Sequence, residues 1–199
     1  MAKERLKSPR LRLFIALEPP EDARALLAGW QRELVAAGSG ELRAAAPESL
    51  HVTFAFIGYR PERDVERLSG ALQSVPPRPV AMDFERTLVA KPVRRPRLYA
   101  VPLVAGSAFL ALRNELVASL TRDSGFEDER REFWPHITLC RVKSSAKGHE
   151  ALTDPPRGPD QLAGATHPAV ALTLFSSDLQ PSGAVYTPLA TVALPAAPQ

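Results

Sequence analysis

The sequence predicts an α+β fold, and three observations predict it. Candidate strands follow one another in runs, helical periodicity appears in only about three segments, and 20 prolines divide the chain into short elements. The 199 residues are 45% apolar and 24% charged, which is the balance of a folded globular protein. A doubly wound parallel sheet would require strands and helices to alternate, and it is therefore not expected.

Strands are expected where short runs rich in β-branched and aromatic residues stop at Pro or Gly. About seven runs of the chain fit this description. They cover residues 11–17, 50–57, 80–89, 98–104, 136–142, 170–175 and 185–194. The last two are joined by the sequence DLQPSGA, whose Pro, Ser and Gly favour a turn.

Three helices are expected because apolar side chains recur there at helical spacing. The first begins at Glu21, whose charge suits the positive end of a helix dipole, and ends at Gly38. The second begins at Pro61 and ends before a pair of prolines. The third covers about residues 107–122.

Two segments lack these patterns. Residues 1–10 are expected to form a flexible basic tail. Residues 143–168 are polar and rich in Gly and Pro, so we expect mostly loop there, with one short helical turn.

Composition excludes several kinds of protein. No apolar run approaches the roughly 20 residues of a membrane span, and the run at 14–17 is too short for a signal-peptide core, so we expect a cytoplasmic protein. The single cysteine, Cys140, excludes an internal disulfide and a multi-cysteine zinc site. The net charge of +3 does not by itself indicate a nucleic-acid partner, although Arg, which supplies most of the positive charge, suits phosphate oxygens.

Two matching motifs, HVTF and HITL, begin at His51 and His136 within expected strands. Because side chains alternate along a strand, His51 and Thr53 share one face, and so do His136 and Thr138. Two imidazoles facing one cleft can act as general base and general acid near neutral pH, and two hydroxyls can hold a phosphate. The motifs therefore suit hydrolysis of a phosphodiester without a metal ion. Two histidines are only part of a zinc site, and no acidic third ligand is evident.

On these residues the chain resembles the two-histidine (2H) phosphoesterase superfamily. Within it, the chain is similar to the RNA 2′,3′-cyclic phosphodiesterases, also called 2′-5′ RNA ligases (LigT-like, ThpR). The resemblance rests on LRLFIALEPP, ESLHVTFAFIG, FWPHITLCRV and LTLFSSDLQPSGAVYTPL, and it spans residues 11–194. It implies a bilobal α+β fold in which two antiparallel sheets flank a central cleft, with a few helices packed on the outside. Residues 1–199 would form a single domain with one motif in each lobe.

The resemblance also implies a reaction, the hydrolysis of an RNA-terminal 2′,3′-cyclic phosphate to a 2′-phosphate, with no cofactor and no metal. His136 would be the base that activates water, and His51 the acid that protonates the departing 3′ oxygen. Thr53, Thr138 and Arg141 would bind the substrate phosphate. Strand parity places Arg141 on the face opposite His136, so this role requires a bulge or a strong twist in the strand.

Other functions of the same cleft stay open. One is the reverse reaction, a 2′-5′ RNA ligase that joins a cyclic phosphate end to a 5′ hydroxyl. Another is a non-catalytic RNA-binding module, against which the two intact motifs count. A third is a hydrolase of a small cyclic nucleotide or of a 2′-5′ oligonucleotide. The expected partner is an RNA end that carries a 2′,3′-cyclic phosphate; we expect a monomer that uses neither a membrane nor a metal.

A basic cluster and several aromatic residues are candidates for RNA contact. The sequence KPVRRPR places Arg94, Arg95 and Arg97 between two expected strands, where they either contact the RNA backbone or are simply solvated. Aromatic side chains could stack on bases, although most aromatics on strands are core residues. The candidates are Phe14, Phe56, Tyr99, Phe133 and Trp134.

Four residues are expected to have no catalytic role. Phe56 has the parity of a core residue unless the strand twists at Gly58. Cys140 is interpreted as a small buried or cleft-wall residue, because no base is placed to activate it as a nucleophile. His149 and His167 fall in the polar segment and are expected to be solvated.

Overall fold

The computed structural model describes residues 9–181 and 183–196. The strands are β1 (Arg10–Glu18), β2 (Leu42–Ala44), β3 (Val52–Pro61), β4 (Ala81–Phe84), β5 (Val89–Lys91), β6 (Leu98–Val104), β7 (His136–Val142), β8 (His167–Pro168), β9 (Ala171–Gln180) and β10 (Gly183–Ala193). The α-helices are α1 (Glu21–Ala37), α2 (Val65–Gln73), α3 (Ser107–Ser124) and α4 (Asp160–Ala163). Short 3₁₀ helices cover Pro47–Ser49 and Glu62–Asp64.

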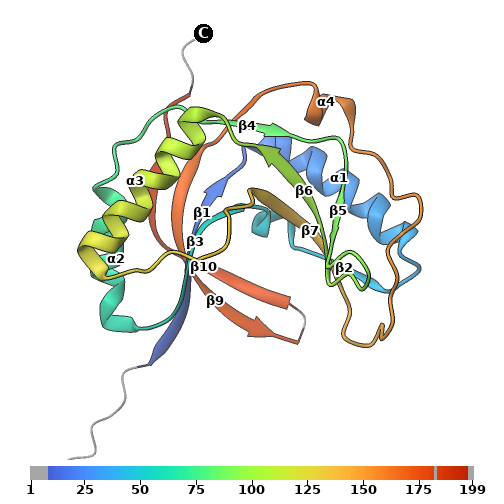
Figure 1. The fold of residues 1–199 in the computed structure, drawn as a ribbon, viewed down its shortest axis with the longest axis horizontal. Coiled ribbons are helices and arrows are strands. Elements are labelled where there is room, and N and C mark those ends of the chain that lie inside the picture. Colours follow the sequence, from blue (N-terminus) through green and yellow to red (C-terminus); the bar gives the residue numbers. More distant parts are fainter. Residues whose placement is uncertain (1–8, 182, 197–199) are drawn as a thin grey trace, which may run out of the picture.

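The strands form two groups that meet at one narrow junction (Figure 1). One group has the order β10-β9-β1-β3, and the other runs β7-β6-β4-β8, with β2 added to β7 and β5 added to β6. Every described strand pair is antiparallel. The groups are joined where Val52 of β3 pairs with Ile137 of β7. The expected α+β class is therefore confirmed, and the expected two sheets are continuous through this junction.

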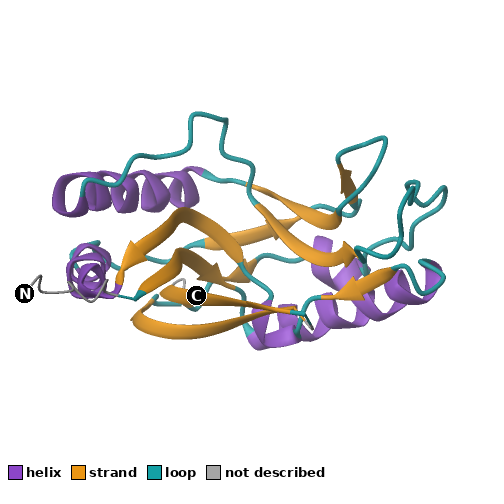
Figure 2. Ribbon diagram, turned by 90° about the horizontal axis from the view of Figure 1, so that it is seen from below, coloured by secondary structure: helices purple, strands orange, loops and turns teal. Residues whose placement is uncertain are grey.

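The helices lie outside the strands. Figure 2 shows α2 and α3 at one end of the molecule and α1 at the other. Helix α1 packs against β2 and β7, whereas α2 packs against α3 and against β9 and β10. Leu27, Trp30 and Leu34 face inward from α1 at the expected helical spacing, and all three are buried. Buried apolar side chains from both strand groups form one core, which fixes the strands that carry the two motifs.

Several expected boundaries need correction. Residues 1–8 of the expected tail lie outside the described residues, and Arg10 already belongs to β1. Strand β3 continues through Gly58, which has φ +79°, and ends at Pro61. A 3₁₀ helix over Glu62–Asp64 then precedes the second α-helix. The expected strand over 80–89 divides into β4 and β5. The short β2 was not predicted, because three residues carry too little periodicity.

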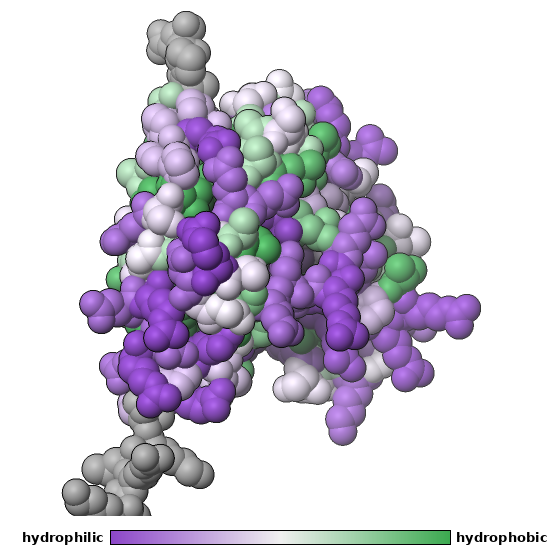
Figure 3. All heavy atoms as spheres, turned by 60° about the vertical axis from the view of Figure 1, so that its left-hand side comes forward, coloured by the Kyte–Doolittle hydropathy of each residue, from purple (hydrophilic) through white to green (hydrophobic). Residues whose placement is uncertain are grey.

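The outer surface is mostly polar. Figure 3 shows hydrophilic side chains over much of one face, with smaller apolar patches between them. Among the described residues, no helix is long and apolar enough to cross a membrane.

Candidate active site

The junction between the strand groups brings the two motifs together. Val52 and Ile137, which directly follow the motif histidines, are antiparallel partners. Side chains of neighbouring residues project from the opposite face of a strand, so the histidines and threonines lie on the other side of the junction from this apolar pair. All four line a single cleft of about 1350 Å³. The structure thus brings together residues that are far apart in the sequence.

Each imidazole is oriented by an equivalent hydrogen bond to a backbone carbonyl group two residues earlier. His51 Nδ1 donates to the carbonyl oxygen of Ser49 at 2.7 Å, and His136 Nδ1 donates to the carbonyl oxygen of Trp134 at 2.8 Å. A carbonyl oxygen can only accept, so the proton of each neutral ring is on Nδ1 and the lone pair is on Nε2. Nε2 of His51 accepts a hydrogen bond from the hydroxyl of Thr53 at 3.1 Å. Each ring can therefore take up or deliver a proton at Nε2.

Aromatic rings pack against both histidines. Phe14 of β1 stacks on His51 with ring centroids 4.9 Å apart, and Trp134 stacks on His136 with centroids 3.9 Å apart. Tyr186 of β10 meets His51 edge-on at 5.4 Å. These contacts restrict rotation of the imidazoles and keep water from one face of each ring. Phe14 and Trp134, candidates for base stacking in the sequence, thus contact the motif histidines.

The surroundings of both histidines lower the pKa values of their imidazoles. Burial lowers the pKa of His51 to about 4, and the charges of His136, Arg24 and Arg141 contribute to the lowering. Burial also lowers the pKa of His136, and Arg141 and Arg131 add to the effect. The hydrogen bonds to the carbonyl oxygens of Ser49 and Trp134 act in the opposite direction. Because both pKa values lie below the ordinary 6.5, both rings are neutral at pH 7.

A bulge in β7 brings Arg141 to the cleft. Thr138 pairs with Ala100 and Cys140 pairs with Tyr99, so Leu139 is an extra residue between two ladder positions. An extra residue reverses the alternation of the side chains after it. Leu139 and Cys140 are consequently both buried, and Arg141 returns to the face of the histidine. The bulge that the assignment of Arg141 required is present.

The Leu139 carbonyl oxygen at this bulge has two donors. Gln31 Nε2 of α1 donates to it at 2.6 Å, and the Ala45 amide donates to it at 2.9 Å. The side chain of Gln31 is itself buried. These bonds satisfy the irregular backbone and hold it in place.

An equivalent bulge in β3 corrects the expectation for Phe56. Ala16 pairs with Thr53 and Ile15 pairs with Ala55, so Phe54 is the extra residue. Phe56 is 39% exposed and lines the cleft instead of the core. The expectation for Phe56 assumed regular alternation of side chains along the strand, which the bulge interrupts. Phe56 and Arg141 each follow their motif histidine by five residues, so they occupy matching positions in the two motifs.

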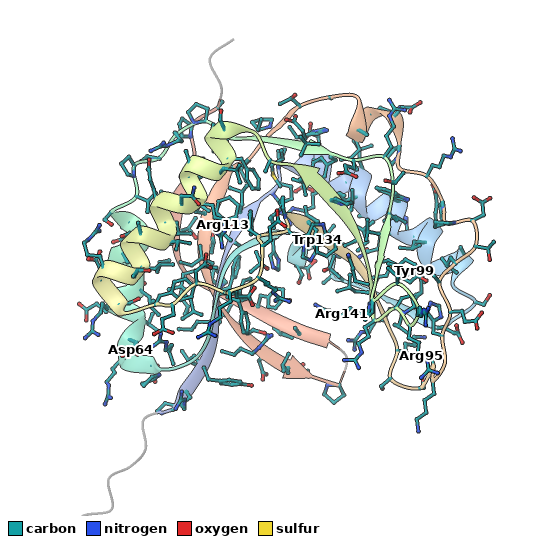
Figure 4. All side chains as sticks on the ribbon, viewed as in Figure 1. Asp64, Arg95, Tyr99, Arg113, Trp134 and Arg141 are labelled. Atoms are coloured by element: carbon teal, nitrogen blue, oxygen red, sulfur yellow. The ribbon has the colours of Figure 1, made fainter. Side chains whose placement is uncertain are left out.

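Further cations line the cleft beyond the predicted residues. The guanidinium of Arg12 lies 4.7 Å from the centroid of the Phe56 ring, and Lys91 Nζ lies 5.3 Å from that of Trp134. Figure 4 shows Trp134 on the segment before β7, between Arg113 of α3 and Arg141 in this view. Seven Arg and Lys side chains line the cleft against three acidic ones, Asp128, Glu129 and Glu132, so its net positive charge favours an anionic ligand. The sequence analysis missed Arg12, because a single Arg on a strand carries no pattern of its own.

The basic cluster stands apart from the cleft wall. Arg94, Arg95 and Arg97 lie on the hairpin between β5 and β6, and none of them lines the cleft. The hairpin nevertheless adjoins the site, since Leu98 pairs with Arg141.

Cys140 is buried, as expected, and burial raises the pKa of its thiol to about 12, so the thiol does not act as a nucleophile.

His149 is buried rather than solvated: its Nδ1 lies 2.5 Å from a Glu41 carboxylate oxygen, and its Nε2 lies 2.9 Å from the Tyr99 hydroxyl. These contacts fasten the long loop to the sheet.

His167 also corrects an expectation. It is buried against Phe84, and its Nε2 bonds to the Leu162 carbonyl oxygen at 3.1 Å. Tyr99 is likewise a core residue and not a base-stacking surface. In the part of the chain that the structure describes, no group of three or more His, Cys, Asp or Glu side chains is placed to hold a metal ion.

Comparison with known proteins shows which families and structures the chain as a whole is similar to. The LigT like Phosphoesterase family model matches residues 17–99. The RNA 2′,3′-cyclic phosphodiesterase of Thermus thermophilus is 29% identical over 197 residues, which cover 90% of this chain and 88% of the relative. A crystal structure from the same species has a TM-score of 0.76 at 27% identity, covering 92% of this chain and 98% of that one. The apo crystal structure of Escherichia coli LigT has a TM-score of 0.72 at 25% identity, covering 94% of this chain and 99% of that one.

Paired strands present two His–Thr motifs to one cationic cleft, which is the arrangement that the resemblance to two-histidine phosphoesterases implies. The family match covers the first motif, and the structural likeness extends over more than nine-tenths of the chain. The family model, the curated relatives and the solved structures together support a LigT-like phosphoesterase.

Proposed function

We propose that this protein hydrolyses the 2′,3′-cyclic phosphate at the end of an RNA and leaves a 2′-phosphate. The observation that carries the proposal is the matched pair of histidines, each held through Nδ1 and able to exchange a proton at Nε2, in one cleft lined by cations. Relatives that cover most of this chain are named RNA 2′,3′-cyclic phosphodiesterase.

We assign the two proton transfers to the two histidines. Nε2 of His136 takes a proton from water as the water oxygen attacks phosphorus. The bond from phosphorus to the 3′ oxygen breaks, and Nε2 of His51 delivers a proton to that oxygen. One P–O bond forms and one breaks, so the product carries a 2′-phosphate and a free 3′ hydroxyl. General acid and general base groups typically contribute about 10² to 10⁴ in rate each.

We assign the phosphate oxygens to Thr53, Thr138 and Arg141. Negative charge accumulates on these oxygens as water adds, and hydroxyl and guanidinium donors stabilise it in a site shielded from water. The bound anion also explains how His51 becomes an acid although burial lowers its pKa. An adjacent negative charge favours the protonated imidazole, so substrate binding raises that pKa and recruits a proton.

The test is incubation with the four nucleoside 2′,3′-cyclic monophosphates, with and without a chelator, followed by separation of 2′- from 3′-phosphate products. We expect only 2′-phosphates, at rates that the chelator leaves unchanged. Formation of 3′-phosphates would contradict the assigned leaving group. Loss of activity on chelation, restored by a divalent ion, would replace this mechanism with a metal-assisted one.

Three broader expectations stay predictions: a single domain over residues 1–199, a monomeric state and a cytoplasmic location. The ligase reaction uses the same groups in reverse, and water as the solvent favours hydrolysis.

A further inference from the structure

Two arginines lie side by side at the edge of the cleft. Arg43 of β2 is the direct antiparallel partner of Arg141 of β7. Directly opposite residues share a face and have Cβ atoms about 5 Å apart. Both side chains line the cleft. The short β2 therefore adds a second guanidinium next to the one assigned to the reacting phosphate.

This pair carries uncompensated charge. Within the described residues, the ion pairs involve other arginines and two histidines, and neither Arg43 nor Arg141 has a carboxylate partner. On the other side of Arg141 in the sheet lies Leu98, which offers no negative charge. Like charges directly opposite in a sheet are destabilising, so the protein carries a cost here that a bound anion would remove.

The two arginines differ in their distance from the chemistry. The charge of Arg141 contributes to the lowered pKa of both His51 and His136, so this guanidinium lies near the two imidazoles. Arg43 instead lies toward the β9–β10 hairpin, where its Nη1 donates to the Pro181 carbonyl oxygen at 3.1 Å. That bond uses one of the five N–H donors of the guanidinium and leaves the others for a ligand.

We infer that Arg43 binds a second phosphate, the one on the 5′ side of the terminal nucleotide, while Arg141 holds the cyclic phosphate beside it. The inference rests on the proposed function and specifies its substrate as an RNA chain end rather than a mononucleotide. A guanidinium forms paired hydrogen bonds to phosphate oxygens, and charge-assisted bonds of this kind are among the stronger ones.

Three uridine substrates separate this role from the others. Uridine 2′,3′-cyclic phosphate lacks the second phosphate, its 5′-phosphorylated form carries it as a monoester, and the dinucleotide UpU 2′,3′-cyclic phosphate carries it as a chain linkage. The variants are Arg43→Gln, Arg43→Lys and Arg67→Gln. Arg67 is exposed on α2 and does not line the cleft, so its variant controls for the loss of one positive charge.

We expect Arg43→Gln to lower kcat/KM about ten- to a hundredfold for the dinucleotide, in line with a charge-assisted hydrogen bond. With the cyclic mononucleotide, kcat/KM should change less than about twofold, since this substrate does not reach Arg43. For the dinucleotide, kcat/KM of Arg43→Lys should lie between the values of wild type and Arg43→Gln, and kcat/KM of Arg67→Gln should equal that of wild type. If the 5′-phosphorylated mononucleotide loses as much as the dinucleotide, any phosphate at this position is bound. If only the dinucleotide is affected, the site recognises the chain linkage.

Two further measurements distinguish a failure of the Arg43 inference from a failure of the proposed reaction. Binding of UpU 2′-phosphate and of uridine 2′-phosphate is measured by calorimetry, which requires no turnover; Arg43→Gln should weaken only the former. Thermal unfolding at low salt should show no loss of stability in this variant, because a repulsion is removed. Equal losses on all three substrates together with a lower Tm would make Arg43 a structural tether of the hairpin and overturn the inference. Absence of activity in the wild type, with selective binding retained, would contradict the proposed reaction and not this phosphate site.

Discussion

Val52 and Ile137 are the only residues of β3 and β7 that pair across the junction of the described strand groups, and each is the aliphatic residue of a His–x–Thr motif. Because the strands run antiparallel, this pairing turns the histidine end of one motif toward the threonine end of the other. One apolar contact therefore aligns all four polar side chains. The chemistry of the cleft depends on a junction that itself contains no polar side chain.

The pH dependence of the reaction tests the electrostatics of the cleft. Both histidine pKa values are lowered, that of His51 to about 4, so the bell-shaped profile of kcat/KM should have its maximum below pH 6.5. Removing a nearby cation favours the protonated imidazole, so Arg141→Gln should move both limbs to higher pH as well as lower the rate. Rates are measured from about pH 3.5 to about pH 9 at constant ionic strength. If both limbs of the profile stay at the same pH in the variant, Arg141 is not close to the imidazoles.

Trp134 positions His136 through its ring as well as its carbonyl group. Trp134→Ala removes the stacked surface but leaves the carbonyl, and it should lower kcat by about ten- to a hundredfold because the imidazole loses its fixed orientation. Trp134→Phe retains an aromatic face and should recover most of this loss. A single-turnover measurement separates kcat from substrate binding. Equal effects of Ala and Phe, confined to KM, would instead indicate that the indole contacts the substrate.

The two threonines are expected to act through their hydroxyl groups. Thr53→Ala and Thr138→Ala should each lower kcat/KM about tenfold or more, because a hydrogen bond to a charged phosphate is lost. The corresponding Ser variants retain the hydroxyl and should remain close to wild type. The comparison is made with a cyclic mononucleotide, which reaches only the reacting groups. If Ser is as damaging as Ala at either position, packing of the methyl group and not hydrogen bonding is the role of that residue.

The cluster Arg94, Arg95 and Arg97 should contribute through the RNA backbone. Affinity for an oligonucleotide with a cyclic phosphate end should fall steeply with salt, because bound counterions are released when phosphates are neutralised. Replacing the three arginines together by Ser should flatten this dependence and leave mononucleotide turnover nearly unchanged. Fluorescence anisotropy over a salt series gives both slopes. Identical slopes for wild type and the triple variant would show that the hairpin is only solvated.

Much of this architecture is predictable because it follows from local patterns. Apolar periodicity places α1 and α3 correctly, and alternation places the motifs at β3 and β7, although β3 begins at Val52, one residue after His51. The repeated motif also identifies His51 and His136 as the residues to examine. None of these inferences requires knowledge of contacts distant in sequence.

The errors arise where tertiary contacts override alternation. The buried Gln31, from a helix more than a hundred residues earlier, bonds to the bulge at Leu139, and no local pattern announces that contact. Phe56 was placed in the core for the same reason, since its parity reverses only once the bulge in β3 is known. His149 was expected in solvent because its segment is polar, but Glu41 and Tyr99 provide partners for both ring nitrogens.

The central claim is that two histidines in one cleft divide the proton transfers between them. The most direct measurement is the single-turnover rate of His51→Ala and His136→Ala on a nucleoside 2′,3′-cyclic phosphate, with thermal unfolding as the check on the fold. The account predicts that each variant loses about 10² to 10⁴ in rate and that the double variant loses less than the product of the two, since the groups act as a unit. A near wild-type rate in either folded variant would contradict it.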